Sequence, residues 1–327
     1  MIPVFDAQPG ERVDLPAYGG LPKKAHVFEE QAIWAVRAAL ASGRALLVRG
    51  EPGSGKSQLA RAAAFKLRLP LVTAVVTART ECTDLCWTFD AVARLAEAQV
   101  KGASDDTGRL DPRRFLHPGP LWWALDWDSA EDPEAPWTRA SRGGSPQPPP
   151  KEWAWEPVKG CVLLIDEMDK AESDVPNALL DVLGNGRIHV PYLEAPVVAP
   201  DGGRPPLVIV TTNEERELPA AFVRRCMVLH LGLPGERDKL IERLVERGHA
   251  HFGDSCGEEV LRRAAGMLAD ERAGARDAGL QAPGQAEYLD LVRALVEMPG
   301  AGGADGQDDV LDRIAAFALK KNPSTET

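Results

Sequence analysis

The sequence has few cysteines, no long apolar run and no excess of basic residues. Only five cysteines occur in 327 residues, and none forms a C-x-x-C pair, which argues against a zinc site or a disulfide framework. No window approaches 18 consecutive apolar residues, so no membrane span is expected. The first residues also lack the basic start and the apolar stretch of a secretory signal. These absences predict a cytoplasmic protein with reduced thiols.

Basic residues are outnumbered, and the formal net charge is −11 at pH 7. Binding to nucleic acid or to an anionic membrane is driven by an excess of lysine and arginine, so the composition argues against both as general partners. Histidine is scarce too. His249 and His251 form an H-x-H pair in a polar stretch, but no third ligand is evident nearby, so we expect a solvated loop rather than a metal site.

The sequence does contain an alternation of short apolar runs and helical patterns. Helical spacing is predicted over 26–43, 57–68, 90–100 and 173–186, and short strands are predicted over 45–50, 69–78, 162–165 and 206–213. This alternation is typical of a parallel sheet with crossover helices. From residue 233 onward the helical spacing continues and the strand signals stop. We therefore predict an α/β domain over residues 1–232 and an all-α domain over residues 233–327.

A stretch at about 130–158 interrupts the alternation. It contains "RGGSPQPPPKEWAWEP", which has too many prolines and polar residues for a regular element, so we expect a mobile insertion. Tryptophans gather between residues 122 and 155, in this stretch and just before it. If they are exposed, they favour a partner surface, whereas if they pack against the protein's own body they are structural. The sequence leaves both interpretations open for six of the eight tryptophans, namely Trp122, Trp123, Trp127, Trp137, Trp153 and Trp155.

The stretch "GEPGSGKS" at residues 50–57 fits the phosphate-loop pattern G-x-x-x-x-G-K-[ST] and lies between a predicted strand and a predicted helix. Loop glycines let backbone N–H groups close around phosphates, and the helix N-terminus adds partial positive charge. We expect Lys56 to neutralise the β- and γ-phosphates and the Ser57 hydroxyl to ligate Mg²⁺. The predicted nucleotide-binding residues are Gly50, Glu51, Pro52, Gly53, Ser54, Gly55, Lys56, Ser57 and Gln58.

A second motif, "CVLLIDEMDK" at residues 161–170, places three carboxylates directly after an apolar strand. Ligands of parallel sheets bind beyond the carboxyl ends of the strands, so Asp166 would emerge beside the phosphate loop. We expect Asp166 to hold Mg²⁺ and Glu167 to orient and activate the attacking water. Alternatively, both residues are the cap and first-turn charge of the following helix. Asp169 and Lys170 are expected on a solvated helix face.

Asn213 follows the next predicted strand of the chain. Its amide could hydrogen-bond the γ-phosphate and the attacking water, and so sense hydrolysis. A strand-ending asparagine on its own is usually a turn or cap residue. The prediction therefore depends on the order of the motifs, in which Asn213 comes after the phosphate loop and the two carboxylates.

The ordered set "GEPGSGKS", "LLIDE", "VIVTTN" and "LPAAFVRRC" resembles an AAA+ ATPase. The resemblance implies a Walker A loop, a Walker B strand with its catalytic glutamate, a sensor asparagine, and an arginine-finger region at Arg224 and Arg225. Arg225 aligns better, because it directly precedes the place of the family's usual phenylalanine, which is Cys226 here. The implied fold is that of a P-loop NTPase, with a parallel sheet sandwiched by helices and a small all-α lid domain after it.

Three further stretches are similar to the MoxR-like branch of these ATPases. Residues 77–92 resemble its segment after the second strand, residues 114–125 its short hairpin insert around a G-P-L turn, and residues 186–213 the β-hairpin before the sensor strand. The branch often has a basic sensor residue at the start of a late lid helix, where Gln281 and Ala282 stand here. Either another residue such as Arg276 replaces that sensor, or the lid responds weakly to nucleotide.

The resemblance implies a Mg²⁺-dependent enzyme that converts ATP and water to ADP and phosphate. It also implies a ring, commonly a hexamer, in which the arginine finger reaches the nucleotide of the neighbouring subunit. MoxR-like proteins resemble chaperones that remodel or activate a partner, often one with a von Willebrand A domain, and some belong to bacterial conflict systems. Two alternatives stay open: a nucleotide-switched oligomeric scaffold in a conflict or signalling system, and a nucleic-acid motor, against which the acidic charge weighs.

Overall fold

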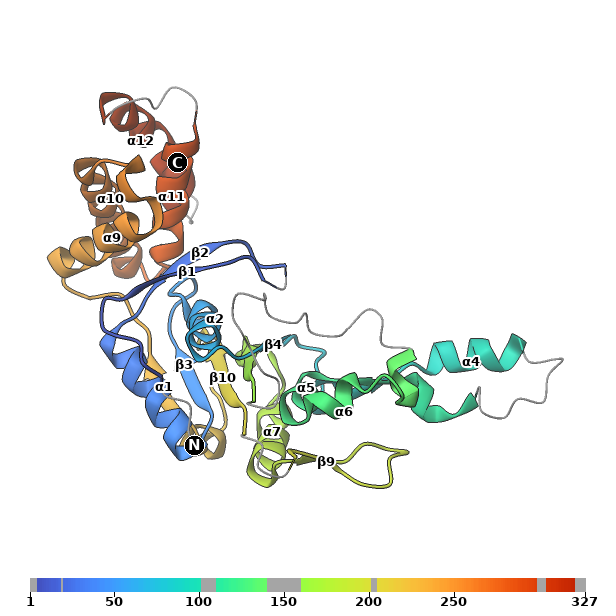
Figure 1. Cartoon of the computed structure of the whole chain (residues 1–327). Helices are drawn as coiled ribbons and strands as arrows, with labels where there is room; N and C mark the ends of the chain where they lie inside the picture. Colours follow the sequence, from blue (N-terminus) through green and yellow to red (C-terminus); the bar gives the residue numbers. More distant parts are fainter. Residues whose placement is uncertain are drawn as a thin grey trace.

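A five-stranded parallel sheet lies at the centre of the computed structural model, which describes residues 5–18, 20–100, 110–139, 160–200, 205–298 and 304–320 (Figure 1). The strand order is β11, β3, β10, β7, β4, and every neighbouring pair is parallel. The predicted parallel sheet is therefore confirmed. Its strands are β3 (Leu46–Arg49), β4 (Leu71–Val75), β7 (Val162–Asp166), β10 (Leu207–Thr212) and β11 (Met227–His230).

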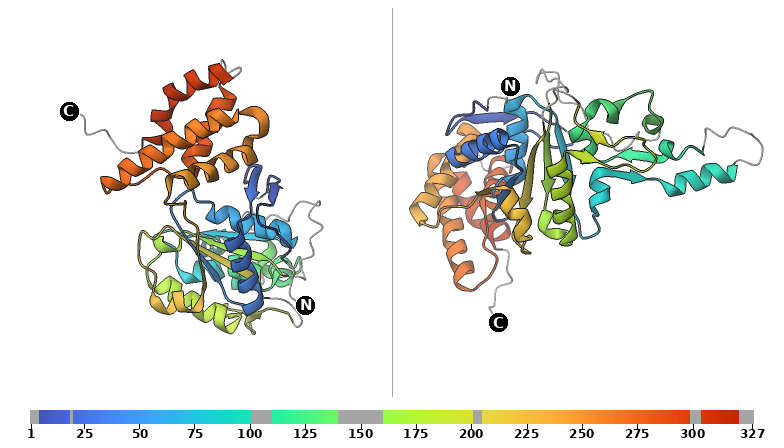
Figure 2. Two further views of the ribbon diagram at one scale, coloured as in Figure 1. Left: turned by 90° about the vertical axis from the view of Figure 1, so that its left-hand side faces the viewer. Right: turned by 90° about the horizontal axis from the view of Figure 1, so that it is seen from below.

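Helices cover both faces of the sheet (Figure 2), so its strands read as continuous apolar runs rather than as alternating ones. In β7, Val162 and Leu164 belong to the core on one face, and Leu163 and Ile165 to the core on the other. The first face is covered by α1 (Glu30–Ser42) and α2 (Lys56–Leu67). The second face is covered by α3 (Cys82–Cys86), α5 (Pro120–Leu125), α7 (Asp174–Asn185) and α8 (Ala220–Arg225).

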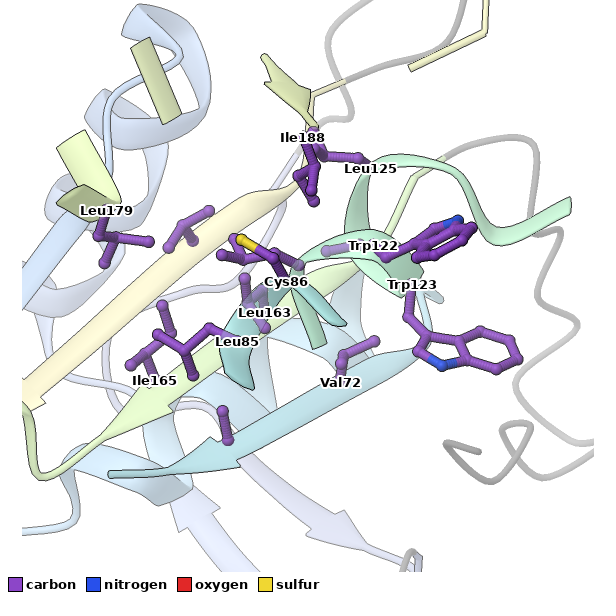
Figure 3. Packing of buried hydrophobic residues seen from close by; sticks show 14 of the residues in the cluster. Val72, Leu85, Cys86, Trp122, Trp123, Leu125, Leu163, Ile165, Leu179 and Ile188 are labelled. Carbon is purple, nitrogen blue, oxygen red and sulfur yellow. The ribbon is translucent and has the colours of Figure 1, made fainter. Parts of the chain in front are cut away.

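The described tryptophans of the tryptophan-rich stretch pack against the protein's own body. Trp122, Trp123 and Trp127 are buried, and Figure 3 shows the first two beside the sheet residues Val72 and Leu163. The Trp122 indole donates to Ser129 Oγ at 2.8 Å. Regular structure continues to residue 139 through α6 (Trp127–Glu131) and η3 (Pro136–Arg139). Residues 140–159, with Trp153 and Trp155, lie outside the described residues, so the mobile insertion stays a prediction there.

The G-P-L residues do not form the turn of a hairpin, and that prediction is wrong. Gly119 precedes α5 and Pro120 starts it, because proline suits the first turn of a helix, where its missing N–H costs nothing. The strand before it, β6 (Leu116–Pro118), pairs instead with β5 (Trp87–Phe89). Between these strands lie α4 (Ala91–Val100) and η2 (Pro112–Phe115). The second predicted hairpin is confirmed, since β8 (Arg187–Ile188) pairs antiparallel with β9 (Val197–Val198).

An antiparallel ribbon precedes the sheet, and the sequence patterns did not indicate it. It consists of β1 (Arg12–Leu15) and β2 (Lys24–Val27), so the helix predicted over 26–43 begins only at Glu30. The buried Arg61 of α2 holds the ribbon by donating to the carbonyls of Pro16 and Pro22. A tertiary contact of this kind overrides the local helical pattern.

The chain after residue 232 forms a group of helices with a core of its own (Figure 1). They are α9 (Arg237–Phe252), η7 (Gly253–Ser255), α10 (Glu258–Asp277), α11 (Gln285–Glu297) and α12 (Ala304–Leu319). His249 and His251 lie in α9, so the predicted loop is wrong: the apolar helical spacing continues through this polar stretch. No helix among the described residues is long and apolar enough to cross a membrane. A domain boundary at residue 232 stays a prediction.

Candidate functional site

The predicted phosphate loop connects β3 to α2 at the carboxyl edge of the sheet. Gly53 and Gly55 have φ angles of 75° and 93°, values that a residue with a Cβ rarely adopts. At Gly53 a Cβ would also lie 2.6 Å from the Cβ of Ala286 in α11. The loop can therefore take this shape, and pack this closely against the C-terminal helices, only with glycine at that position.

A cavity of about 350 Å³ lies between this loop, the ends of β7 and β10, and the C-terminal helices. Of the predicted nucleotide-binding residues, Pro52, Gly53, Gly55, Lys56, Ser57 and Gln58 line it. Gly50, Glu51 and Ser54 belong to the loop but not to the cavity lining. Three residues predicted for magnesium and catalysis, Asp166, Glu167 and Asn213, line the same cavity.

Lys56 is buried at the start of α2, with its ammonium directed back at its own loop. Its Nζ donates to the carbonyl oxygens of Gly50 at 2.8 Å and Glu51 at 2.9 Å. Burial lowers the pKa of Lys56, while the carboxylates of Asp166 and Asp169 act to raise it. A charged lysine here would exchange these carbonyls for phosphate oxygens.

Asp166, the last residue of β7, lines the cavity directly beside the start of α2. Ser57 Oγ lies 3.0 Å and 2.8 Å from its two carboxylate oxygens. Thr211 of β10 also donates to Asp166 and accepts the backbone N–H of Glu167 at 3.0 Å, a role that the sequence patterns did not indicate. Among the described residues no group of three or more His, Cys, Asp or Glu could hold a metal ion. Ser57 and Asp166 alone can therefore offer only two oxygen ligands to a metal ion. This number suits Mg²⁺, which usually takes its remaining ligands from phosphate oxygens and water.

Glu167 has a left-handed backbone, with φ at 61°, which is unusual for a residue other than glycine. It occupies the N-cap position of the short helix η6 (Met168–Lys170), as the capping alternative expects of this region, but its side chain makes no capping hydrogen bond. Its carboxylate instead accepts from Lys170 Nζ at 2.6 Å, which raises the pKa of Lys170. Lys170 is thus partly exposed but paired, not simply solvated.

Asp169 is buried at 2% exposure, which corrects the prediction of a solvated helix face. Its Oδ2 accepts the backbone N–H groups of Asn213 at 3.2 Å and Glu215 at 3.0 Å. The tight turn of η6 folds Asp169 back against the end of β10, whereas a continuous α-helix would have carried it into solvent. The carboxylate of Asp169 therefore connects the segment that carries Glu167 to the segment that carries Asn213 through hydrogen bonds.

The predicted arginine fingers lie apart from this group. Arg224 and Arg225 end α8 with exposed side chains, and neither lines the cavity. Arg44 fixes the end of the helix by donating to the backbone carbonyls of both arginines, at 2.9 Å for Arg225. The structure thus brings together the loop, Asp166, Glu167 and Asn213 within one chain, but not the arginines.

The C-terminal helices supply the far wall of the cavity. Gln285, Ala286, Leu289, Asp290 and Arg293 of α11 line it, together with Lys24 and His251. Arg276 does not line the cavity but lies 3.6 Å from Glu51, and Gln281 and Ala282 do not line it either. The basic residue that α11 presents is Arg293, two turns beyond Gln285, and the helical spacing of these residues is the signal that could have identified it.

His251 marks a basic region at one end of the cavity. Burial, followed by the charges of Arg247, Arg293 and Lys24, lowers the pKa of His251 to about 4. The residue is therefore neutral at pH 7, and the positive charge around it comes from its neighbours.

A parallel sheet with a phosphate loop between its first strand and the following helix defines the P-loop nucleotide-binding class. The chain matches the AAA domain family, dynein-related subfamily, over residues 45–226. This match covers more than half of the sequence, and the chain belongs to that family of AAA+ ATPases. A comparison with curated proteins finds no match.

Several solved structures are similar to the chain. A presumed ATPase from Cytophaga hutchinsonii has 17% identity and a TM-score of 0.37, covering 88% of this chain and 81% of its own. RuvB from Thermotoga maritima has 14% identity and a TM-score of 0.43, with 90% and 68% covered. NtrX from Brucella abortus in complex with ADP has 13% identity and a TM-score of 0.36, with 91% and 52% covered. The family assignment rests on the family match, not on these distant likenesses.

Proposed function

We propose that the chain is a Mg²⁺-dependent ATPase that converts ATP and water to ADP and phosphate. The observation that carries the proposal is the single cavity lined by Lys56, Ser57, Asp166, Glu167 and Asn213. Lys56 provides positive charge for phosphate groups, and Ser57 and Asp166 provide two oxygen ligands for Mg²⁺. Glu167 provides a carboxylate that can activate water, and Asn213 provides an amide that can hydrogen-bond the water and the γ-phosphate. The family match supports the same activity.

The residues present fit a magnesium–nucleotide complex. Ser57 and Asp166 lie within hydrogen-bond distance of each other, as two ligands of one ion would. Ser57 and Asp166 would hold the ion, which would supply positive charge beside the phosphate groups. Lys56 would bind phosphate oxygens, Glu167 would accept a proton from the attacking water, and Asn213 would hydrogen-bond that water.

The position of Arg225 supports assembly. An arginine that stabilises developing charge must approach the γ-phosphate, yet Arg225 is exposed at the end of α8 and away from its own cavity. A ring, commonly a hexamer, would place it at the nucleotide of the neighbouring subunit through a heterologous interface. We include Arg224 as the weaker candidate for this role.

We further propose that the protein is a MoxR-like chaperone that uses ATP hydrolysis in the cytoplasm to remodel or activate a protein partner. The β8–β9 hairpin before β10 supports this branch, since it is the segment that resembles the hairpin of that family. The partner would be a von Willebrand A domain protein or a conflict-system effector. It would be remodelled as the C-terminal helices move over the phosphate loop during the ATP cycle.

Phosphate release from ATP tests the enzymatic proposal. We expect turnover with Mg²⁺, loss of turnover on chelation, and a fall of about 100-fold or more for Glu167→Gln while nucleotide binding persists. Glu172→Gln is the matched control, because this glutamate lies nearby but pairs with Arg216 on the exposed surface. Full activity of Glu167→Gln, or equal rates with and without Mg²⁺, would overturn the proposal.

One observation favours a second candidate, the nucleotide-switched scaffold. Lys170 Nζ lies 2.6 Å from Glu167 Oε2, so this carboxylate must leave the ion pair before it can accept a proton from water. This candidate predicts slow turnover and an assembly that requires ATP but not its cleavage. Light scattering of the wild type and Glu167→Gln with ATP and with ADP tests whether assembly requires ATP but not its cleavage. The rate of phosphate release then separates the candidates, because only the scaffold predicts slow turnover by the assembled wild type.

A further inference from the structure

We infer that Glu51 is a positioning residue that links the phosphate loop to the C-terminal helices and transmits nucleotide binding to them. The inference rests on the proposed function, since it concerns the same ATP site. Glu51 occupies a variable position of the loop motif and does not line the cavity, so phosphate binding itself does not require its side chain. Its contacts lead away from the cavity, toward α10.

Glu51 is the acidic partner of a buried arginine. Arg272, in the last third of α10, is 2% exposed, and its Nη2 donates to Glu51 Oε2 at 2.5 Å. Its Nη1 donates to the carbonyl of Pro283 at 2.8 Å, just before α11 begins. One guanidinium thus joins α10, the start of α11 and the loop. Arg276, one turn further along α10, lies 3.6 Å from the other Glu51 oxygen.

The two loop residues after Glu51 touch the same helices. A Cβ on Gly284, the residue that precedes α11, would lie 3.3 Å from the carbonyl oxygen of Pro52. Gly53 packs still closer, against Ala286 in the first turn of α11. Three consecutive loop residues therefore form one continuous contact with α10 and α11. A shift of the loop backbone must be accommodated by these helices, because so close a contact leaves no space to absorb it.

Lys56 connects this contact to nucleotide binding. Its ammonium binds the backbone carbonyl of Glu51, the residue whose side chain holds Arg272. Phosphate oxygens compete with that carbonyl for Lys56. Binding of a triphosphate therefore frees the Glu51 backbone from Lys56, so that the Glu51 side chain binds Arg272 more tightly and slows the opening of α10. The proposed path runs from the phosphates through Lys56 and Glu51 to Arg272. It does not require the basic lid sensor that is absent at Gln281 and Ala282.

Glu51→Gln tests the path, because the amide keeps the size of the side chain but removes its charge. Hydrogen-exchange mass spectrometry would follow peptides of α10 and the start of α11 with and without a non-hydrolysable ATP analogue. In the wild type we expect the analogue to slow exchange there by about tenfold, which lies within the usual range for coupled sites. In Glu51→Gln the slowing should fall below about twofold, measured at an analogue concentration that titration calorimetry shows to saturate the variant.

Asp270→Asn is the matched control. Asp270 lies on the same helix and pairs with Arg237 on the exposed surface, so this change removes one negative charge without touching the loop. Its nucleotide-dependent slowing should equal that of the wild type. A melting curve checks that both variants fold, and Arg276→Gln, at the longer of the two contacts, provides a milder change on the same path.

The outcomes separate this inference from the proposed function. If the analogue binds Glu51→Gln and slows exchange in α10 as strongly as in the wild type, the link through Glu51 is wrong and the ATP site stands. If Asp270→Asn loses the slowing as well, the response depends on total charge and the specific path is refuted. If the wild type binds no analogue at all, the proposed function itself fails.

Discussion

The buried carboxylate of Asp169 gives the sharpest test of how the site is built. It accepts the backbone N–H groups of Asn213 and Glu215 and so fixes the loop that carries the predicted sensor amide. A hydrogen bond to a charged group contributes about 1.5–3 kcal/mol, so losing both in Asp169→Ala should lower the free energy of unfolding by about 3 kcal/mol or more. Asp169→Asn keeps an acceptor in place and should lower it by only about 1 kcal/mol.

Thermal unfolding and phosphate release together measure these effects. For Asp169→Ala we expect a melting temperature lower by about 6–12 °C and a kcat lower by about 100-fold, because a small displacement of a catalytic group has effects of that size. The KM for ATP should change little. Glu172→Gln, at an exposed ion pair, should alter neither quantity. An unchanged melting temperature would refute the energetic reasoning, and a normal kcat in a destabilised protein would refute the link to Asn213.

Three further outcomes follow from the site and its surroundings. Lys56→Ala should weaken ATP binding by about tenfold or more, measured by titration calorimetry, and an unchanged affinity would contradict the role of Lys56 at the phosphates. Ser57→Ala should raise the Mg²⁺ concentration for half-maximal turnover by about tenfold, and an unaltered Mg²⁺ dependence would exclude the Ser57 hydroxyl as a ligand. Burial, followed by the charge of Arg247, lowers the pKa of His26 from 6.5 to about 3. As the pH falls, His26 is therefore protonated in the unfolded chain before it is protonated in the folded protein. The free energy of unfolding is unaffected by His26 above pH 6.5 and decreases as the pH falls from 6.5 toward 3. His26→Phe should reduce that decline by about 1.4 kcal/mol per pH unit between pH 6 and 5, measured by denaturation at each pH, and an identical slope would refute it.

The sheet and its strand-ending residues could be predicted from the sequence because local patterns determine them. Continuous apolar runs such as Val162 to Ile165 indicate strands buried on both faces, and the loop motif fixes the strand-to-helix connection. The β1–β2 ribbon could not be predicted in this way. Arg61 of α2, which is distant in the sequence, holds the ribbon in place. A local sequence pattern does not indicate a contact of this kind.

The residues of the candidate site likewise fall into two groups, those that sequence motifs predict and those that only tertiary contacts define. Lys56, Ser57, Asp166, Glu167 and Asn213 stand in motifs, and the structure places them around one cavity. Thr211, Asp169 and Arg272 act through partners that lie far away in the sequence, and their burial depends on the tertiary fold. For Asp169 the sequence pattern was misleading, because one short turn at η6 decides whether this carboxylate faces solvent or the end of β10.

Mixing two inactive variants tests the central claim, that ATP is hydrolysed at a site completed by a neighbouring subunit. Glu167→Gln and Arg225→Ala should each lack turnover alone. In a mixed ring, each Arg225→Ala subunit contributes an intact Glu167 and a Glu167→Gln neighbour contributes an intact Arg225. Random mixing in equal amounts should therefore restore activity at about a quarter of the sites. Turnover by Arg225→Ala alone, or no recovery on mixing variants that still assemble, would contradict the claim.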